Sequence, residues 1–140
     1  MTDEKIIQDC RTLIQAFKEK KLGYMKMPED ANPCFSKNQL NEKLSYFTLP
    51  MALNYQRNSY KLWEAALKTY NNKECRKIFD VEFCAKANEN EIRQILLKYK
   101  IALQPNNHVK IWQTISKTVF NNFNSFQGLL EESTFDYLKL

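Results

Sequence analysis

Apolar residues recur along most of the chain at intervals of three and four positions, the spacing that places them on one face of an α-helix. Trp63, Ala66, Leu67 and Tyr70 show the pattern most clearly. Strand-like alternation is absent, and glycine occurs only at positions 23 and 128. We therefore predict an all-α fold: a single compact helical-bundle domain of about six to eight helices over residues 1–140.

Breaker residues divide this pattern into three parts. Residues 1–23 are predicted as an amphipathic N-terminal helix with Gly23 as its stop, and residues 24–36 hold two prolines and are predicted as an extended linker. Residues 37–140 form the helical body. The apolar face of the N-terminal helix consists of Ile6, Cys10, Leu13, Ile14 and Phe17.

The body opens with two helices joined by a polar corner. Ser36 followed by Gln39 fits a capping box, so we expect a helix to begin near Asn38. Pro50 lacks an amide hydrogen, and we expect the helix to kink or restart there. Asn58 or Ser59 then caps the next helix. The corner between the two helices is expected at Gln56, Arg57 and Asn58.

Later helix starts are also marked. Asp80 and Asn88 are expected caps, and the last long helix is expected to start within Gln104-Pro105-Asn106-Asn107. His108 falls in the first turn of that helix. We expect an ordinary exposed histidine, with a contact to the backbone or to an anion as the alternative.

The net charge of +5 is concentrated in one quarter of the chain. Residues 43–77 carry seven basic and two acidic side chains, whereas the segments on either side are balanced. A localised basic region attracts a polyanion more effectively than the same charge spread evenly. The alternative is a solvated helix face.

Composition argues against several classes of protein. The four cysteines lack zinc or iron–sulfur spacing, and there is one histidine, so we predict no metal site or cofactor and reduced thiols. The sequence contains no run of eighteen apolar residues, so we predict no transmembrane helix. The start MTDEKIIQD is unlike a signal peptide, and we therefore expect a cytoplasmic protein. No Gly-rich phosphate loop or nucleophile elbow points to an enzyme.

The segment LPMALNYQRNSYKLWEAALKTY resembles the early helices of the helix-hairpin-helix, endonuclease III-like DNA glycosylase superfamily. In that family an apolar helix ends in a Gln before polar residues, and Gln56, Arg57, Asn58, Ser59 and Tyr70 lie at matching offsets. IRQILLKYKIALQPNNHVKIWQTISKTV and FQGLLEESTFDYLKL resemble the helices that follow. The resemblance covers residues 44–140, although the turn at 103–106 lacks the family's glycine and Pro50 interrupts a usually continuous helix.

The resemblance implies DNA binding rather than catalysis for this chain. The family's hairpin, catalytic lysine and aspartate, and cluster cysteines have no counterpart, so we expect no glycosylase or lyase activity. An iron–sulfur cluster is expected only if a C-terminal extension supplies cysteines. The resemblance assigns Gln56 the role of filling the gap that a flipped base leaves, with Asn58 and Ser59 supporting it or contacting phosphate.

The physical chemistry of the corner fits double-stranded DNA. A helix N-terminus at Ser59 offers unpaired amides to a phosphate, and Arg57 and Lys61 add salt-dependent attraction. The alternative function is a helical protein–protein interaction module without a role in nucleic-acid binding. In this alternative, the apolar C-terminal turn FDYLKL is the expected contact surface, either for a protein partner or for self-association.

Overall fold

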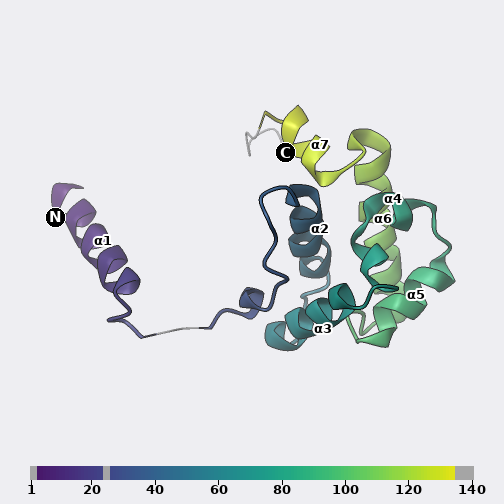
Figure 1. Ribbon diagram of the computed structural model, residues 1–140, viewed down its shortest axis with the longest axis horizontal. Coiled ribbons are helices and arrows are strands. Elements are labelled where there is room, and N and C mark those ends of the chain that lie inside the picture. The colour runs from purple at the N-terminus through teal and green to yellow at the C-terminus, as the bar shows by residue number, and fades with distance from the viewer. Residues whose placement is uncertain (1–2, 24–25, 135–140) are drawn as a thin grey trace.

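The structure is a computed structural model that describes residues 3–23 and 26–134. Within these ranges the chain is all-helical, with no strand, which confirms the predicted fold class (Figure 1). Seven α-helices and two short 3-10 helices follow one another along it. Their bounds are α1 Asp3–Lys18, η1 Pro28–Asp30, α2 Leu40–Met51, α3 Ser59–Asn71, η2 Arg76–Phe79, α4 Val81–Lys86, α5 Glu89–Lys98, α6 Pro105–Phe123 and α7 Phe126–Glu132.

The helices from α2 onward pack together, and α6 is the longest of them (Figure 1). Helices α4 and α5 lie against α6, α7 bridges α6 and α2, and α3 contacts α2, η1 and η2. The predicted stripe on α3 is confirmed, since Trp63, Ala66 and Tyr70 are buried and Leu67 is half-buried. No helix in the described ranges is both long and apolar enough to cross a membrane.

Aromatic rings form the centre of the core. The fully buried ring of Tyr46 lies 5.2–5.7 Å, centre to centre, from five other rings, those of Phe35, Phe47, Trp63, Tyr70 and Phe79. Edge and tilted arrangements of this kind stabilise a pair beyond the area that it buries. The Tyr46 hydroxyl also donates to the carbonyl of Ala31 (2.8 Å), which fixes the connection before α2 to the core.

The first turn of α2 differs from the sequence prediction. The helix begins at Leu40, two residues after the expected start, because the side chain of Gln39 turns back. Its Oε1 accepts from the amide and the hydroxyl of Ser36, both at 3.0 Å. Only one half of the expected capping box therefore forms, and the Ser36 hydroxyl does not cap the helix.

Pro50 ends a helix rather than restarting one. Helix α2 runs through it and stops one residue later at Met51. A proline in the last turn removes one hydrogen bond, and no further turns depend on it. Met51 and Ala52 are exposed, and the chain then returns to the core at Leu53, which is buried.

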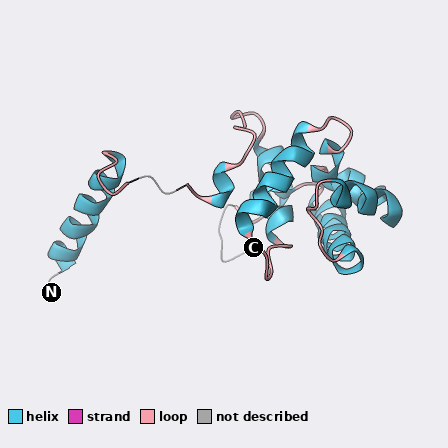
Figure 2. Cartoon of the chain, turned by 90° about the horizontal axis from the view of Figure 1, so that it is seen from below, coloured by secondary structure: helices cyan, strands magenta, loops and turns pink. Residues whose placement is uncertain are grey.

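Helix α1 stands apart from the others (Figures 1 and 2). None of its residues is buried, and the side chains of its predicted apolar face are exposed to solvent. The linker that follows contains the turn η1 instead of being extended throughout.

Candidate functional site

The corner between α2 and α3 has the predicted cap. The side chain of Asn58 accepts from the amide of Lys61 at 3.0 Å and begins α3. Ser59 is the first residue of the helix, and its hydroxyl donates to Oδ1 of Asn54 (3.1 Å). Gln56 adopts the left-handed conformation, with φ of 50°, and is exposed. This conformation turns the chain sharply into α3.

Arg57 fastens the corner to a distant part of the chain. Its guanidinium donates to the carbonyl of Lys100 (3.1 Å) and, at short range, to the carbonyl of Ile101. Both acceptors belong to the connection between α5 and α6. Partial burial lowers the pKa of the guanidinium. The side chain therefore acts as a structural tie between the corner and the α5–α6 connection. Its terminal nitrogens are occupied, but its positive charge still contributes to the local electrostatic potential.

This tie creates a groove of about 220 Å³ between α3 and the α5–α6 connection, which we call the corner groove. Besides Arg57, three cations line it: Lys61 and Lys68 on α3, and Lys100 opposite them. Lys61 is a predicted site residue, whereas Lys100 lies outside the 43–77 window. Lys68 pairs with Glu64 (2.8 Å). Within the described ranges Lys61 and Lys100 have no ion pair. The groove is lined by Arg57, Asn58, Lys61, Glu64, Ala65, Lys68, Tyr99, Lys100 and Leu103.

Tyr55 is a residue of this corner that sequence reasoning missed. Its side chain is 78% exposed beside Gln56. An aromatic ring in this position offers a flat face to a ligand. The only available sequence signal was its place immediately before the polar residues of the corner.

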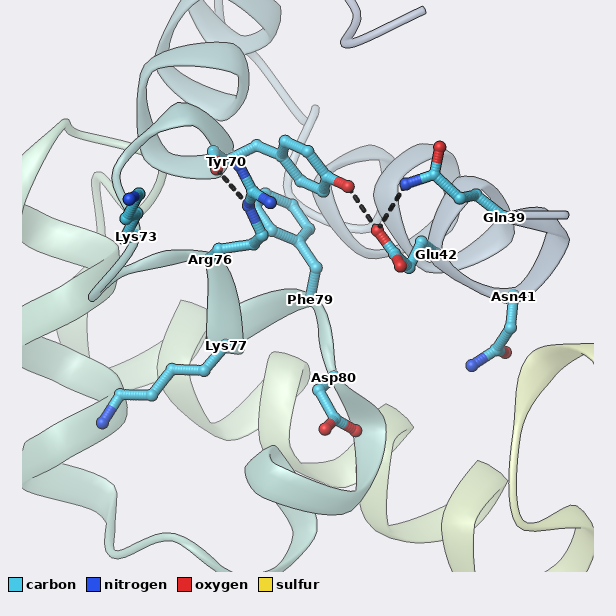
Figure 3. A pocket seen from close by; sticks show the side chains of 9 residues that line it. All are labelled: Gln39, Asn41, Glu42, Tyr70, Lys73, Arg76, Lys77, Phe79 and Asp80. Atoms are coloured by element: carbon cyan, nitrogen blue, oxygen red, sulfur yellow. Dashed lines mark hydrogen bonds between the residues drawn. The ribbon is translucent and has the colours of Figure 1, made fainter. Parts of the chain in front are cut away.

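The remaining basic residues of the 43–77 window lie elsewhere. Helix α3 has 13 residues and is about 20 Å long at 1.5 Å per residue. It ends at Asn71, so Lys73, Arg76 and Lys77 lie beyond its far end. They line a second hollow of about 450 Å³ with residues of α2 and η2 (Figure 3). The structure thus divides one basic stretch of sequence between two places.

The polar groups of the second hollow are largely engaged with one another (Figure 3). Arg76 donates through Nε to the carbonyl of Tyr70 (2.8 Å) and lies over that ring. The Tyr70 hydroxyl donates to Glu42, and this bond together with burial raises the pKa of the phenol to about 12. Lys77 pairs with Glu91 at 2.6 Å. The second hollow therefore contains two carboxylates, Glu42 and Asp80, whereas the corner groove contains one, Glu64.

The expectation that His108 is an ordinary exposed histidine is wrong. The residue is only 9% exposed, and its Nδ1 accepts from the amide of Leu103 (3.1 Å) and, more weakly, of Gln104 (3.5 Å). Burial and the nearby Arg57 lower the pKa of the imidazole. Backbone contact, the alternative, is what the structure shows, and His108 steadies the connection that Arg57 also holds.

The described residues contain no group of three His, Cys, Asp or Glu side chains that could hold a metal ion. Cys10 and Cys34 are exposed, Cys75 and Cys84 are buried, and all four are free thiols. Comparison of the chain with known protein families, with curated proteins and with solved structures found no match.

Proposed function

We propose that this chain binds double-stranded DNA through the corner groove. The supporting observation is that the N-terminus of α3 and three lysines, Lys61, Lys68 and Lys100, meet in one groove. Two of these lysines are unpaired within the described part of the chain. A phosphate backbone is the ligand that suits a groove of this charge, because each neutralised phosphate releases condensed counterions.

The first turn of α3 supplies directional donors for a phosphate. Asn58 satisfies the amide of Lys61, but the amides of Ser59 and Tyr60 have no partner among the described residues. Two amides at a helix N-terminus, together with the positive end of the helix dipole, form a site suited to an anion. Lys61 would then neutralise the same phosphate or its neighbour.

Tyr55 and Gln56 give the corner a means of contacting bases. Both are exposed and precede the phosphate site by a few residues. Stacking of a base on an aromatic ring contributes about 1–3 kcal/mol. A Gln at this corner is also what the resemblance to the helix-hairpin-helix glycosylases implies for filling the gap beside a flipped base. We therefore propose a preference for duplexes that already lack a base, since less unstacking is then needed.

Removing the unpaired charges of the corner groove tests whether the groove binds DNA. The double variant Lys61→Gln, Lys100→Gln should lower the slope of log affinity against log salt by about two, because each phosphate contact contributes about 0.9. The control is Lys117→Gln, an exposed lysine of α6 that does not line the groove. Its slope should match that of the original chain. Equal slopes for all three proteins would exclude the groove as the DNA site.

The alternative function, a helical protein–protein interaction module, is favoured by the exposed apolar face of α1. The apolar C-terminal turn from which self-association was predicted lies at residues 135–140, outside the described residues. If the chain has no affinity for duplex DNA near physiological salt, this alternative replaces the first.

A further inference from the structure

Helix α1 exposes a continuous apolar face. Ile6, Ile7, Leu13, Ile14 and Phe17 are between 44% and 64% exposed, and no residue of the helix is buried. Ile6, Cys10, Leu13 and Phe17 follow one another at intervals of four, three and four residues. This alternation of four and three residues matches positions a and d of a heptad, the seam along which two helices pair.

An unpacked helix of this length is marginal in water. Sixteen residues lie close to the lower limit at which an isolated helix forms, and most helical stability in proteins comes from packing of an apolar face. In the described part of the chain the helix lies away from the body (Figure 2). A partner that covers the seam would therefore stabilise α1 as a helix.

The charges of the segment indicate which partner. Residues 3–10 carry a net charge of −2, from Asp3, Glu4 and Asp9 against Lys5. Residues 11–21 carry a net charge of +3, with Lys18 at the end of the helix and Lys20 and Lys21 beyond it. A second copy of α1 that runs in the opposite direction places acidic against basic ends. A parallel copy places like charges together.

The backbone favours the same arrangement. Each helix carries partial positive charge at its N-terminus and partial negative charge at its C-terminus, so antiparallel neighbours attract. The seam also matches itself when reversed. Ile6 then lies opposite Phe17, and Cys10 lies opposite Leu13. A two-fold axis relates the two copies, so the interface is closed and stops at a dimer.

We propose that α1 is a dimerisation helix that pairs antiparallel with α1 of a second copy of this chain. This interaction involves surface remote from the corner groove and does not depend on DNA binding. Two helices of about four turns bury much less than the roughly 1,600 Å² of a standard interface. The dimer is therefore weak and forms in a concentration-dependent manner.

Sedimentation velocity of the full chain over a hundredfold range of concentration tests the dimer. The original chain should shift from monomer to dimer, and Leu13→Lys should weaken association at least tenfold. Leu97→Lys is the matched control, because Leu97 is also an exposed leucine (38%) but belongs to α5. It should associate like the original chain. A monomer at every concentration, or equal loss in both variants, would overturn the proposal.

Disulfide trapping tests the direction. In a Cys34→Ser background, one protein keeps Cys10 and the other carries Cys10→Ser with Leu13→Cys. Cys75 and Cys84 are buried and shielded. Mild oxidation of an equal mixture should yield mainly the disulfide between the two different proteins, identified by mass. Predominance of disulfides between like proteins would indicate a parallel pair, and a random mixture would indicate collision without a defined interface. Either result would contradict the antiparallel helix pair.

Discussion

At the residue scale, the buried imidazole of His108 acts as a hydrogen-bond acceptor that protonation would remove. Its Nδ1 accepts from the amide of Leu103, and its pKa is lowered from the ordinary value near 6.5. A base whose pKa is lowered on folding takes up its proton first in the unfolded chain. Its contribution to stability is therefore complete above about pH 6.5 and is lost as the pH falls through the lowered pKa.

We predict that the free energy of unfolding falls between pH 7.5 and 5.5 more in the original chain than in His108→Asn. The amide oxygen of Asn can accept a hydrogen bond but does not titrate in this range. Urea denaturation at both pH values measures the difference. Carboxylates titrate equally in the two proteins and cancel. An identical loss of stability in both would contradict the assignment of His108 as a neutral acceptor.

The hydrogen bonds of Arg57 lead to a separate prediction about stability. Its guanidinium donates to the carbonyls of Lys100 and Ile101. A hydrogen bond to a charged group contributes about 1.5–3 kcal/mol to the free energy of unfolding. Because the side chain is only half-buried, we expect Arg57→Ala to lower the free energy of unfolding by about 1–3 kcal/mol.

Lys61→Ala is the matched control for Arg57→Ala. Lys61 carries the same charge at the same corner, but its side chain makes no hydrogen bond within the described residues. Its replacement should change stability by less than about 0.5 kcal/mol. Denaturant unfolding compares the two. Equal effects would show that charge, and not the tie to the α5–α6 connection, is what Arg57 contributes.

At the scale of the helical elements, the start of α7 depends on a glycine. Ser125 caps this helix by accepting from the amide of Gly128 at 3.0 Å. A Cβ atom at position 128 would lie 2.1 Å from the carbonyl oxygen of Phe123, which is far inside van der Waals contact. The end of α6 and the start of α7 therefore approach each other closely at a position without a side chain.

We predict that Gly128→Ala destabilises the protein by about 1–3 kcal/mol, the usual range for overpacking. Within a helix that had space, the same substitution would stabilise by up to about 1 kcal/mol. The sign of the change in the free energy of unfolding therefore shows whether there is space for a side chain at position 128. Glu132→Ala, at an exposed position of the same helix, is the control. A more stable Gly128→Ala variant would contradict the close approach of α6 and α7.

Helix boundaries were predictable where the signal was local. Asn58, Asp80 and Asn88 all cap helices as their sequence context indicated, because each cap contacts an amide only two or three residues ahead. The prediction failed at Ser36 and Gln39, where two equally local hydrogen bonds compete and the side chain of Gln39 accepts from Ser36. Composition cannot rank such alternatives.

At the scale of the whole molecule, the all-α bundle and its aromatic core follow from periodicity and composition. The geometry of the candidate site does not. Arg57 finds its acceptors 43 and 44 residues away, and the basic window is divided between the corner groove and the second hollow. The exposure of Tyr55 and the burial of His108 also depend on how distant elements pack, which a single sequence does not encode locally.

The measurement that tests the central claim most directly is a salt titration of binding to a short labelled duplex, intact or with one abasic site. We predict tighter binding to the abasic duplex, an affinity that falls steeply with salt, and loss of the abasic preference in Gln56→Ala with the salt slope unchanged. Absence of binding to both duplexes near physiological salt would contradict the account, and the corner groove would then be an ordinary solvated surface.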